Sequence, residues 1–392
     1  MSIDSETRTS SAVSSASWVA RDLASVWHPF TQHSVWPSDE PLVIDRGEGM
    51  YLVDTDGRRY LDGVSSLWVT VHGHGEPAID DAVRDQLGRL AHSTFLGLTH
   101  EPGIELAEKL LACAPPGLSK VFYAGDGASA VEAALKMAYQ AAAQRGEHRP
   151  LFVSVAEGYH GDTLGAVSVG GISLFHATYR PILLETRQVS SPGLPVGSAA
   201  RALEVVAELR TLMEREGSSV SAIIVEPMVQ AAAGMLTHDA AFLQGVRALC
   251  DEFGALMIAD EVATGVGRTG RMWAVEHASV APDLLTCGKG LTAGYLPLSA
   301  VLATSSVYEA FLGRPDQGRT FFHGHTYTAN PLACAAAIAN LDLMVSRNTV
   351  AAAAAIGDLL GTALQPLAAL PGVTEIRRIG TMTGIEIGPF DP

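Results

Sequence analysis

Two residues of opposite charge stand where buried strands are predicted to end. An unbroken apolar run from Ala255 to Ala259 is typical of a strand buried on both faces, and it ends in Asp260. A second short run, Leu284 to Cys287, is followed by Lys289 between two glycines, which leave room around its amine. Ligands of open α/β sheets bind at the carboxyl ends of the strands. Both side chains are therefore candidates for chemistry.

An aspartate and a lysine in these places suit one cofactor particularly well. Pyridoxal phosphate needs a lysine that holds its aldehyde as a Schiff base and a carboxylate that keeps its pyridine nitrogen protonated. The charged ring then withdraws electrons from a substrate carbanion. The same two residue types also form structural ion pairs on such folds, so on these residues alone both interpretations stay open.

The segment after residue 124 predicts an anion site. A strand over residues 120–124 leads into a glycine turn, and a helix with the apolar face Val131, Ala134, Leu135 and Ala138 follows. Backbone N–H groups and the helix dipole at such a start favour a phosphate group. The turn lacks the Gly-Lys-Ser/Thr of a nucleotide loop and the third glycine of a dinucleotide fingerprint. A phosphate monoester is the natural guest, although many similar turns bind nothing.

The elements around these residues predict an α/β fold. Strands alternate with helices from about residue 120 to 300, which indicates a doubly wound, mostly parallel sheet. Tyr159 follows another predicted strand, where its ring could lie flat on a cofactor, although a lone tyrosine more often packs on its own sheet. Alternation around Asp56-Gly57 predicts a hairpin. After Asn330 the pattern changes to two helices and two short strands, a smaller α+β domain.

Composition excludes several classes of protein. The chain has 392 residues, 47% hydrophobic and 17% charged, which is typical of a core-rich enzyme. Its net charge of −16, without a basic run, argues against nucleic acid or anionic membrane as a partner. Four cysteines lie far apart without a CxxC motif, which favours a reducing cytoplasm. We expect no apolar stretch of membrane-spanning length.

Two HisXHis pairs raise the possibility of a metal site. His72 and His74 lie in one glycine-rich segment, and His323 and His325 lie in another. Neither pair has a third ligand at the usual spacing, so we expect no metal. A metal-dependent hydrolase remains the alternative from a different class of function.

Longer motifs resemble the class III, fold-type-I, pyridoxal-phosphate-dependent aminotransferases. The motifs are DEVATGVGRTG (260–270), GKGLTAGYLPL (288–298), GYHGDT (158–163), VEPMVQ (225–230) and HTYTANPLAC (325–334), and the likeness runs from Trp27 to the end. Within the class, WHPFTQ (27–32), SSLWVTVHGH (65–74) and AHSTFLGLTH (91–100) resemble the branch that converts 8-amino-7-oxononanoate to 7,8-diaminononanoate in biotin synthesis.

The resemblance implies a role for each matching residue. Lys289 would hold the cofactor aldehyde and serve as the base, and Asp260 would bind the pyridine nitrogen. The family's sites lie at a homodimer interface, so His325 and Thr326 would reach the phosphate of the partner subunit. The remaining implied contacts are Val262 and Tyr159 on the two faces of the ring, the backbone N–H groups of Gly127 and Ala128 on the phosphate, and Phe30, Leu67, Trp68 and Gly324 along the substrate slot.

Three departures from the family pattern bear on the substrates. Phe30 replaces a usual tyrosine, and Leu67-Trp68 replaces a pair of tryptophans. Both differences resemble a branch that uses lysine, not S-adenosylmethionine, as amino donor. We also expect that the family's C-terminal domain continues past residue 392 and supplies an arginine for the keto-acid carboxylate. We expect the arginines near the end of this chain to be surface or structural residues: Arg314, Arg319, Arg377 and Arg378.

The expected organisation has four parts. Residues 1–17 form a disordered arm, 18–75 an N-terminal segment that packs with the small domain, 76–329 the large cofactor-binding domain, and 330–392 a small, incomplete domain. Two further functions stay open: another class III ω-aminotransferase acting on a diamine or ω-amino acid, and an inactive truncated subunit. The alanines at 231–233 argue against relatives of the ornithine type, which carry a glutamate there.

Overall fold

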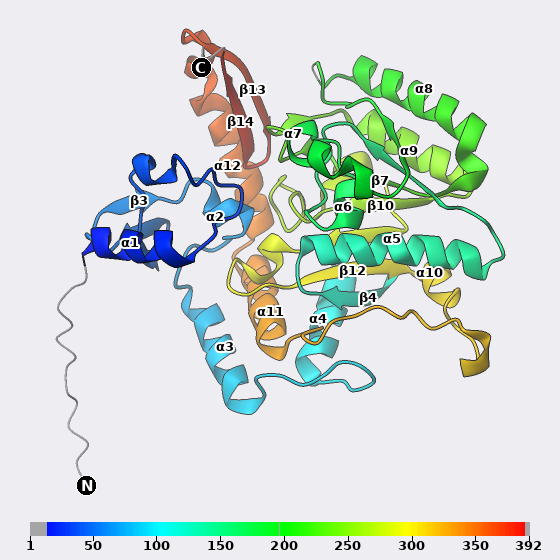
Figure 1. The fold of residues 1–392 in the computed structure, drawn as a ribbon, viewed down its shortest axis with the longest axis horizontal. Coiled ribbons are helices and arrows are strands. Elements are labelled where there is room, and N and C mark those ends of the chain that lie inside the picture. Colours follow the sequence, from blue (N-terminus) through cyan, green and yellow to red (C-terminus); the bar gives the residue numbers. More distant parts are fainter. Residues whose placement is uncertain (1–13, 196, 389–392) are drawn as a thin grey trace. The chain divides into compact units, whose positions relative to one another are not determined.

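The computed structural model describes residues 14–195 and 197–388, and it divides into two compact units, Met1–Pro77 and Ala78–Pro392. Each unit is described by itself (Figure 1). In the first unit the hairpin expected at Asp56-Gly57 is confirmed, because β2 and β3 pair antiparallel across it. The elements of this unit are α1 (Ser15–Ser25), β1 (Ile44–Glu48), β2 (Tyr51–Asp54), β3 (Arg59–Leu61) and α2 (Ser65–Trp68).

Helix α1 begins earlier than the expected disordered arm allows. Ser14 caps the helix, and its hydroxyl accepts a hydrogen bond from the backbone N–H of Ser17. The arm therefore does not extend to residue 17. The rest of it, residues 1–13, lies outside the described residues.

A seven-stranded sheet organises the second unit. Its strand order is β4-β12-β11-β10-β7-β5-β6, and β12 alone runs antiparallel to its two neighbours. The expected doubly wound, mostly parallel sheet is thereby confirmed. The strands are β4 (Leu118–Ala124), β5 (Leu151–Val155), β6 (Thr186–Val189), β7 (Val220–Val225), β10 (Leu256–Asp260), β11 (Leu284–Cys287) and β12 (Ser299–Thr304).

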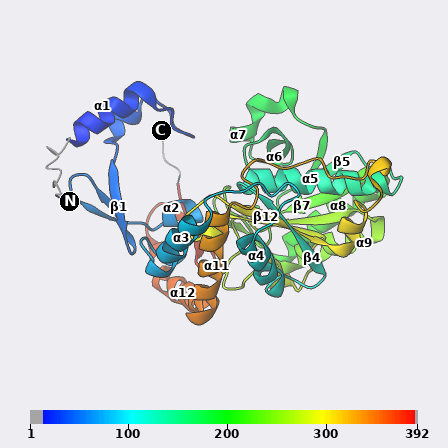
Figure 2. The ribbon, with the colours of Figure 1, turned by 90° about the horizontal axis from the view of Figure 1, so that it is seen from below.

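Helices cover both faces of this sheet (Figure 2). On β10, Ile258 belongs to the core cluster that includes α5, whereas Met257 and Ala259 belong to clusters on the opposite face. Both faces of the strand are therefore buried, as its apolar run predicts. The longer helices are α3 (Pro77–Arg89), α4 (Glu101–Ala112), α5 (Gly127–Gln144), α8 (Ala199–Glu216), α9 (Ala240–Phe253), α11 (Pro331–Ser346) and α12 (Thr349–Ala363).

Smaller elements complete the second unit. Short helices α6 and α7 lie between β5 and β6, α10 follows β12, and β8 and β9 form a two-stranded ribbon after β7. Their bounds are α6 (Leu164–Ser168), α7 (Ser173–His176), α10 (Ser305–Glu309), β8 (Val229–Gln230) and β9 (Leu236–Thr237).

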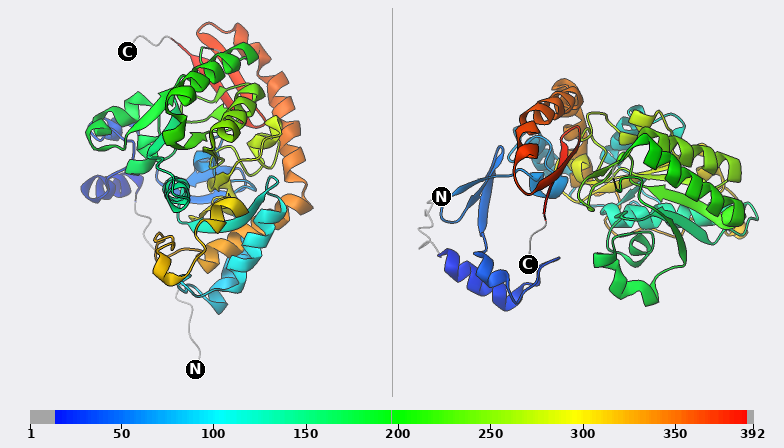
Figure 3. Two further views of the ribbon diagram at one scale, coloured as in Figure 1. Left: turned by 90° about the vertical axis from the view of Figure 1, so that its right-hand side faces the viewer. Right: turned by 90° about the horizontal axis from the view of Figure 1, so that it is seen from above.

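The C-terminal part has the two helices and two strands that the sequence predicts. Strands β13 (Val373–Ile379) and β14 (Met382–Ile387) pair antiparallel, and they lie beside α12 (Figure 3). The stretch Thr349–Ala369 is long and apolar enough to cross a membrane, with a mean hydropathy of 1.4. The expectation that the chain has no such stretch was therefore wrong on length and composition. One such helix is weak evidence for a membrane span, and only 6% of its most apolar window is buried within the chain.

Candidate active site

Asp260 and Lys289 lie at the same edge of the sheet. Strands β10 and β11 run parallel, and Asp260 pairs with Thr286 three residues before Lys289. Lys289 begins a short 3-10 turn with a φ of 45°, a left-handed conformation that is uncommon for a lysine. The prediction that these two residues follow neighbouring strands is confirmed. Strained backbone of this kind is frequent at functional sites.

Three hydrogen-bond donors surround the carboxylate of Asp260, which is only 4% exposed. One oxygen, Oδ1, accepts from the backbone N–H of Val262 at 3.1 Å and from the hydroxyl of Thr286 at 2.9 Å. The other, Oδ2, lies 2.7 Å from Nδ1 of His160. Each of these contacts suits a carboxylate in its charged form.

His160 was not among the predicted site residues, although its side chain contacts Asp260. Burial alone would lower the pKa of its imidazole, but the hydrogen bond and the charge of Asp260 outweigh burial and raise that pKa. The signal available in the sequence was its position directly after Tyr159, at the end of β5. Strand β7 separates β5 from β10 in the sheet, so sequence spacing alone does not predict this contact.

Lys289 occupies an environment that favours a neutral amine. Burial lowers its pKa, and the like charge of Arg268 lowers it further, against the opposite effect of Asp260 and Glu226. A neutral amine is the form that attacks a carbonyl carbon and accepts a proton. The lowered pKa therefore suits both roles expected of Lys289.

Val262 lies between the start of α5 and the strand end that carries Lys289. A Cβ placed on Gly127 would lie 2.7 Å from Cγ1 of Val262, and one placed on Gly288 would lie 3.7 Å from the same atom. Gly127 is the first residue of α5, which Asp126 caps by accepting from the N–H of Ser129. The N–H groups of Gly127 and Ala128 belong to the first turn, where the helix itself provides no acceptor.

These residues fit pyridoxal phosphate. The first turn of α5 supplies donors for a phosphate, and the close approach of Gly127 to Val262 leaves no room there for a side chain. Asp260 supplies the anion that a pyridinium nitrogen requires, and Lys289 supplies the amine. Phosphate donors, ring partner and amine thus come from one sheet edge.

Tyr159 is held in place by polar and aromatic neighbours. Its hydroxyl donates to Oδ2 of Asp162 at 2.8 Å, and its backbone N–H donates to Oε2 of Glu226 at 2.9 Å. Its ring lies edge-on to Phe175 at 6.3 Å and nearly parallel to His176 at 6.5 Å. Burial raises the pKa of the hydroxyl above its ordinary value, so Tyr159 stays neutral.

His325 lies beside the glycine turn that precedes α5 in its own chain. Its Cε1 atom would be 3.6 Å from a Cβ placed on Gly125, and its buried Nε2 has no hydrogen-bond partner among the described residues. Gly324 and Thr326 are exposed. Whether His325 and Thr326 serve the phosphate of the partner subunit stays a prediction about the dimer.

The substrate residues predicted in the first unit sit on unusual backbone. Ser65, Ser66, Leu67 and Trp68 all have a positive φ, as does Phe30. Left-handed geometry costs L-residues about 1–2 kcal/mol each, so other contacts must hold this turn. Asp62 provides them, because its carboxylate accepts from the N–H and the hydroxyl of Ser66 at 2.8 and 2.7 Å. Phe30 and Leu67 are 70% and 65% exposed within this unit.

The HisXHis pairs have other contacts. Nε2 of His74 lies 2.9 Å from Oδ2 of Asp62, and Nδ1 of His323 lies 3.1 Å from Nζ of Lys136. Among residues 14–195 and 197–388, no group of three His, Cys, Asp or Glu could hold a metal ion. The two pairs therefore give no support to a metal-dependent hydrolase.

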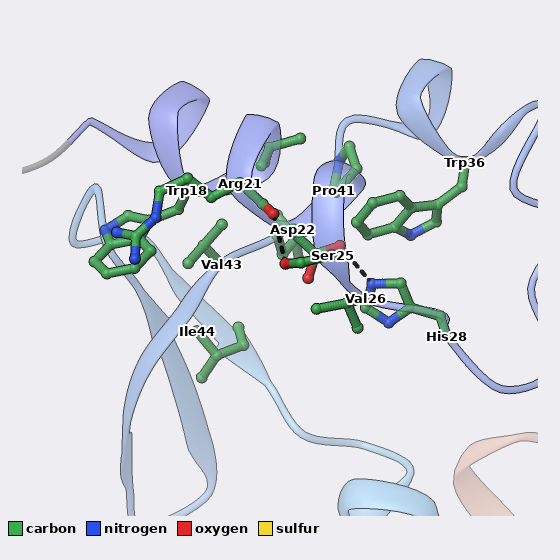
Figure 4. A pocket seen from close by; sticks show the side chains of 12 residues that line it. Trp18, Arg21, Asp22, Ser25, Val26, His28, Trp36, Pro41, Val43 and Ile44 are labelled. Carbon is green, nitrogen blue, oxygen red and sulfur yellow. Dashed lines mark hydrogen bonds and ion pairs between the residues drawn. The ribbon is translucent and has the colours of Figure 1, made fainter.

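The first unit also contains a cavity of about 410 Å³ between α1 and β1. Figure 4 shows Trp18 and Ile44 on one side of the cavity and His28 beside Trp36 on the other; the ring of His28 is 2.8 Å from Oδ1 of Asp22 and packs on Trp36. None of the predicted substrate residues Phe30, Leu67 and Trp68 lines this cavity.

The four arginines expected to be structural make local contacts. Arg314 pairs with Asp316 at 3.1 Å, and Arg377 pairs with Glu375 and Glu386 at 2.5 Å each. Arg319 and Arg378 donate to backbone carbonyls. A different arginine, Arg268, is coupled electrostatically to Lys289, and burial lowers its pKa to about 10. Arg268 was not among the predicted site residues, although it lies inside the DEVATGVGRTG motif.

Comparisons with known proteins identify the family of the chain. The model of the aminotransferase class-III family matches residues 34–390. The chain is 50% identical, over 93% of its length and 69% of the relative's, to the adenosylmethionine-8-amino-7-oxononanoate aminotransferase of Nitratidesulfovibrio vulgaris. The crystal structure of the Methanocaldococcus jannaschii enzyme of that name has a TM-score of 0.90 and 41% identity, covering 94% of this chain and 83% of that one. An (S)-enantioselective omega-transaminase from Thermomicrobium roseum has a TM-score of 0.90 and 34% identity, covering 96% and 85%. The chain belongs to the class III aminotransferases, which depend on pyridoxal phosphate.

Proposed function

We propose that this protein transfers an amino group to 8-amino-7-oxononanoate and so forms 7,8-diaminononanoate, a step of biotin synthesis. The observation that carries the proposal is the arrangement of Asp260, Lys289 and the first turn of α5 around Val262. The names of relatives up to 50% identical support the acceptor. The motifs at 27–32, 65–74 and 91–100 support the same branch.

Lys289 has two roles in the proposed reaction. Its amine would hold the cofactor's aldehyde, and when free it would serve as the base that moves a proton at the substrate carbon. The lowered pKa of Lys289 favours the neutral amine, which is the form that both roles require. When bound, pyridoxal phosphate supplies the electron sink for this chemistry.

Other residues hold the cofactor in place. Asp260 would keep the ring nitrogen protonated, Tyr159 and Val262 would pack on the ring, and the N–H groups of Gly127 and Ala128 would hold the phosphate. Three donors already orient Asp260. Asp260 and His160 are buried, whereas Lys289, Tyr159 and Val262 are partly exposed.

Arg268 is our candidate for the acceptor's carboxylate. A carboxylate on a long apolar chain is costly to bury without a positive partner. Arg268 is partly buried, and its positive charge acts on Lys289, which supports this assignment. Arg268→Lys should raise the KM for the keto acid more than it lowers kcat, because a lysine keeps the charge but loses the planar fork.

The amino donor is a separate question. Phe30 and Leu67 support lysine as the amino donor. The names of the relatives instead include adenosylmethionine. Product formation from 8-amino-7-oxononanoate with each donor in turn decides between them. Turnover with S-adenosylmethionine but not with lysine would refute lysine as the amino donor.

A second candidate function stays within the same chemistry. The Thermomicrobium roseum structure supports an ω-aminotransferase that acts on other amines. The preferred amino acceptor distinguishes the two candidate functions. An ω-aminotransferase that acts on other amines would turn over simple keto acids better than 8-amino-7-oxononanoate.

We also propose that the protein is a homodimer with shared sites and that it acts in the cytoplasm. The resemblance supports the dimer, and four free cysteines support a reducing compartment.

The test of the function is spectroscopic. The purified protein with pyridoxal phosphate should show a visible absorption band that hydroxylamine removes. Lys289→Ala should lose that band and reduce turnover by many orders of magnitude, because nucleophile and base are removed together. An unchanged spectrum in Lys289→Ala would refute the assignment.

A further inference from the structure

A small cavity with both polar and apolar walls lies beside His160, which contacts the ring-nitrogen carboxylate. Its volume is about 10 Å³, and the polar side chains that line it are His160, Glu226, Gln230 and His238. One water molecule needs roughly 10–15 Å³ and two to four polar partners. The cavity therefore has the size and the lining of a site for a single water.

His160 connects this cavity to Asp260. Its Nδ1 lies 2.7 Å from Oδ2 of Asp260. Its other nitrogen, Nε2, lies toward Gly158, because a Cβ placed on that glycine would be 3.3 Å from it. Gly158 lines the same cavity. One imidazole thus joins the buried carboxylate to the cavity.

Glu226 also lines the cavity and is itself buried. Oε2 accepts from the N–H of Tyr159 at 2.9 Å, and Oε1 accepts from the N–H of Ala231 at 3.0 Å. Both bonds survive protonation, because each oxygen keeps a lone pair and the added O–H can donate to a third group. Burial raises the pKa of Glu226 to about 7, although His160 opposes this.

The other walls of the cavity are fixed. Gln230 donates to the carbonyl of Ala156 at 2.7 Å and accepts from the hydroxyl of Ser191 at 2.5 Å. Nε2 of His238 lies 3.2 Å from the backbone carbonyl of Glu226. Besides these groups, the charged and titratable side chains that act on His160 or Glu226 are Asp260, Lys289, Tyr159 and His176.

We propose that the cavity holds one water molecule between Nε2 of His160 and the carboxyl of Glu226, and that Glu226 is a positioning residue which sets the charge of the His160–Asp260 pair. A proton passes from Glu226 through the water to Nε2. Glu226 is then ionised, and His160 carries both ring protons opposite Asp260. The inference rests on the proposed contact of Asp260 with the cofactor's ring nitrogen.

The first experiment is a high-resolution crystal structure of the holoenzyme. We expect one ordered water within about 3.2 Å of both His160 Nε2 and a Glu226 oxygen. A dry cavity would overturn the proposal.

The second experiment titrates the visible band of the holoenzyme against pH. Glu226→Gln removes a negative charge that acts on Lys289, so the midpoint of the titration should fall by about half a pH unit or more. Glu261→Gln is the matched control, since Glu261 is a second buried glutamate that does not act on Lys289. A Glu226→Gln midpoint equal to that of the wild type would overturn the positioning role. A wild type without any visible band would instead overturn the proposed function.

A third measurement does not depend on the folding of Glu226→Gln. That variant places an amide N–H group against a backbone N–H, so it is expected to be less stable. In Glu261→Gln, the infrared carbonyl band of a protonated buried carboxyl at pH 6 should come from Glu226 and disappear above pH 8. Absence of that band at pH 6 would show that Glu226 holds no proton and would overturn the relay.

Discussion

At the scale of single residues, Asp260 is the most constrained group of the site. Its carboxylate accepts hydrogen bonds from the N–H of Val262, the hydroxyl of Thr286 and the imidazole of His160. Each neighbour donates, so the contacts depend on an acceptor at both oxygens. A neutral amide in this place would offer a donor where the imidazole also donates.

Asp260→Asn tests this dependence. The variant keeps the shape but loses the charge that holds the ring nitrogen protonated. We expect kcat to fall by roughly 10²–10⁴ while cofactor binding weakens much less. Thr286→Val is the matched control, because it removes one hydrogen bond and should cost about tenfold or less. Equal kcat values for Asp260→Asn and the wild type would refute the electron-sink role.

The sequence predicts some of these residues better than others. Asp260 and Lys289 end apolar runs, and parallel strands bring such ends to one edge, so their neighbourhood could be predicted. His160 could not, because its contact joins residues a hundred positions apart. The effect of Arg268 on Lys289 could not be predicted either, since it depends on how the motif folds back.

At the scale of elements, the start of α5 depends on one close approach. The helix position of Gly127 was predictable from the strand, turn and apolar face. The contact with Val262 was not, because it joins α5 to the loop after β10. The antiparallel direction of β12 and the left-handed turn at 65–68 were also not predictable, since neither carries a distinctive pattern.

Gly127→Ala tests the approach of α5 to Val262. The new Cβ would lie 2.7 Å from Cγ1 of Val262, so one of them must move. We expect the Kd for pyridoxal phosphate to rise by about tenfold, which corresponds to about 1.4 kcal/mol. The double variant Gly127→Ala/Val262→Ala should recover part of this loss. Gly88→Ala, on α3 with nothing within 4 Å, should leave the Kd unchanged. A Gly127→Ala variant that binds like the wild type would contradict the contact.

At the scale of the whole molecule, buried carboxyls make stability depend on pH. Burial raises the pKa of Glu261 from 4.5 to about 7. Between these values the folded protein holds a proton that the unfolded chain releases, so the free energy of unfolding falls as pH rises through this window. The full difference is roughly 3 kcal/mol.

Glu261→Gln isolates this contribution in the apoprotein. Thermal melting at pH 5 and pH 8 should show a variant that gains stability relative to the wild type at the higher pH, because glutamine has no proton to lose. A difference in Tm that does not change between the two pH values would mean that Glu261 is not protonated in the folded state.

The shared site of the proposed dimer is also open to test. Thr326 is exposed, and His325 lies beside Gly125 of its own chain, so one chain alone does not decide which phosphate they serve. Thr326→Asp places a negative charge against that phosphate, and Lys289→Ala removes the catalytic amine. Each homodimer should be inactive. In a heterodimer of the two variants, shared sites would join the intact Lys289 of one subunit to the intact Thr326 of the other.

Such a heterodimer, purified with two different affinity tags, should therefore have about half of the wild-type activity per dimer. If Thr326 instead serves the site of its own chain, every site in the heterodimer carries a defect. The heterodimer would then be as inactive as either homodimer. Activity in the heterodimer thus distinguishes a site built from two subunits from a site that one subunit completes.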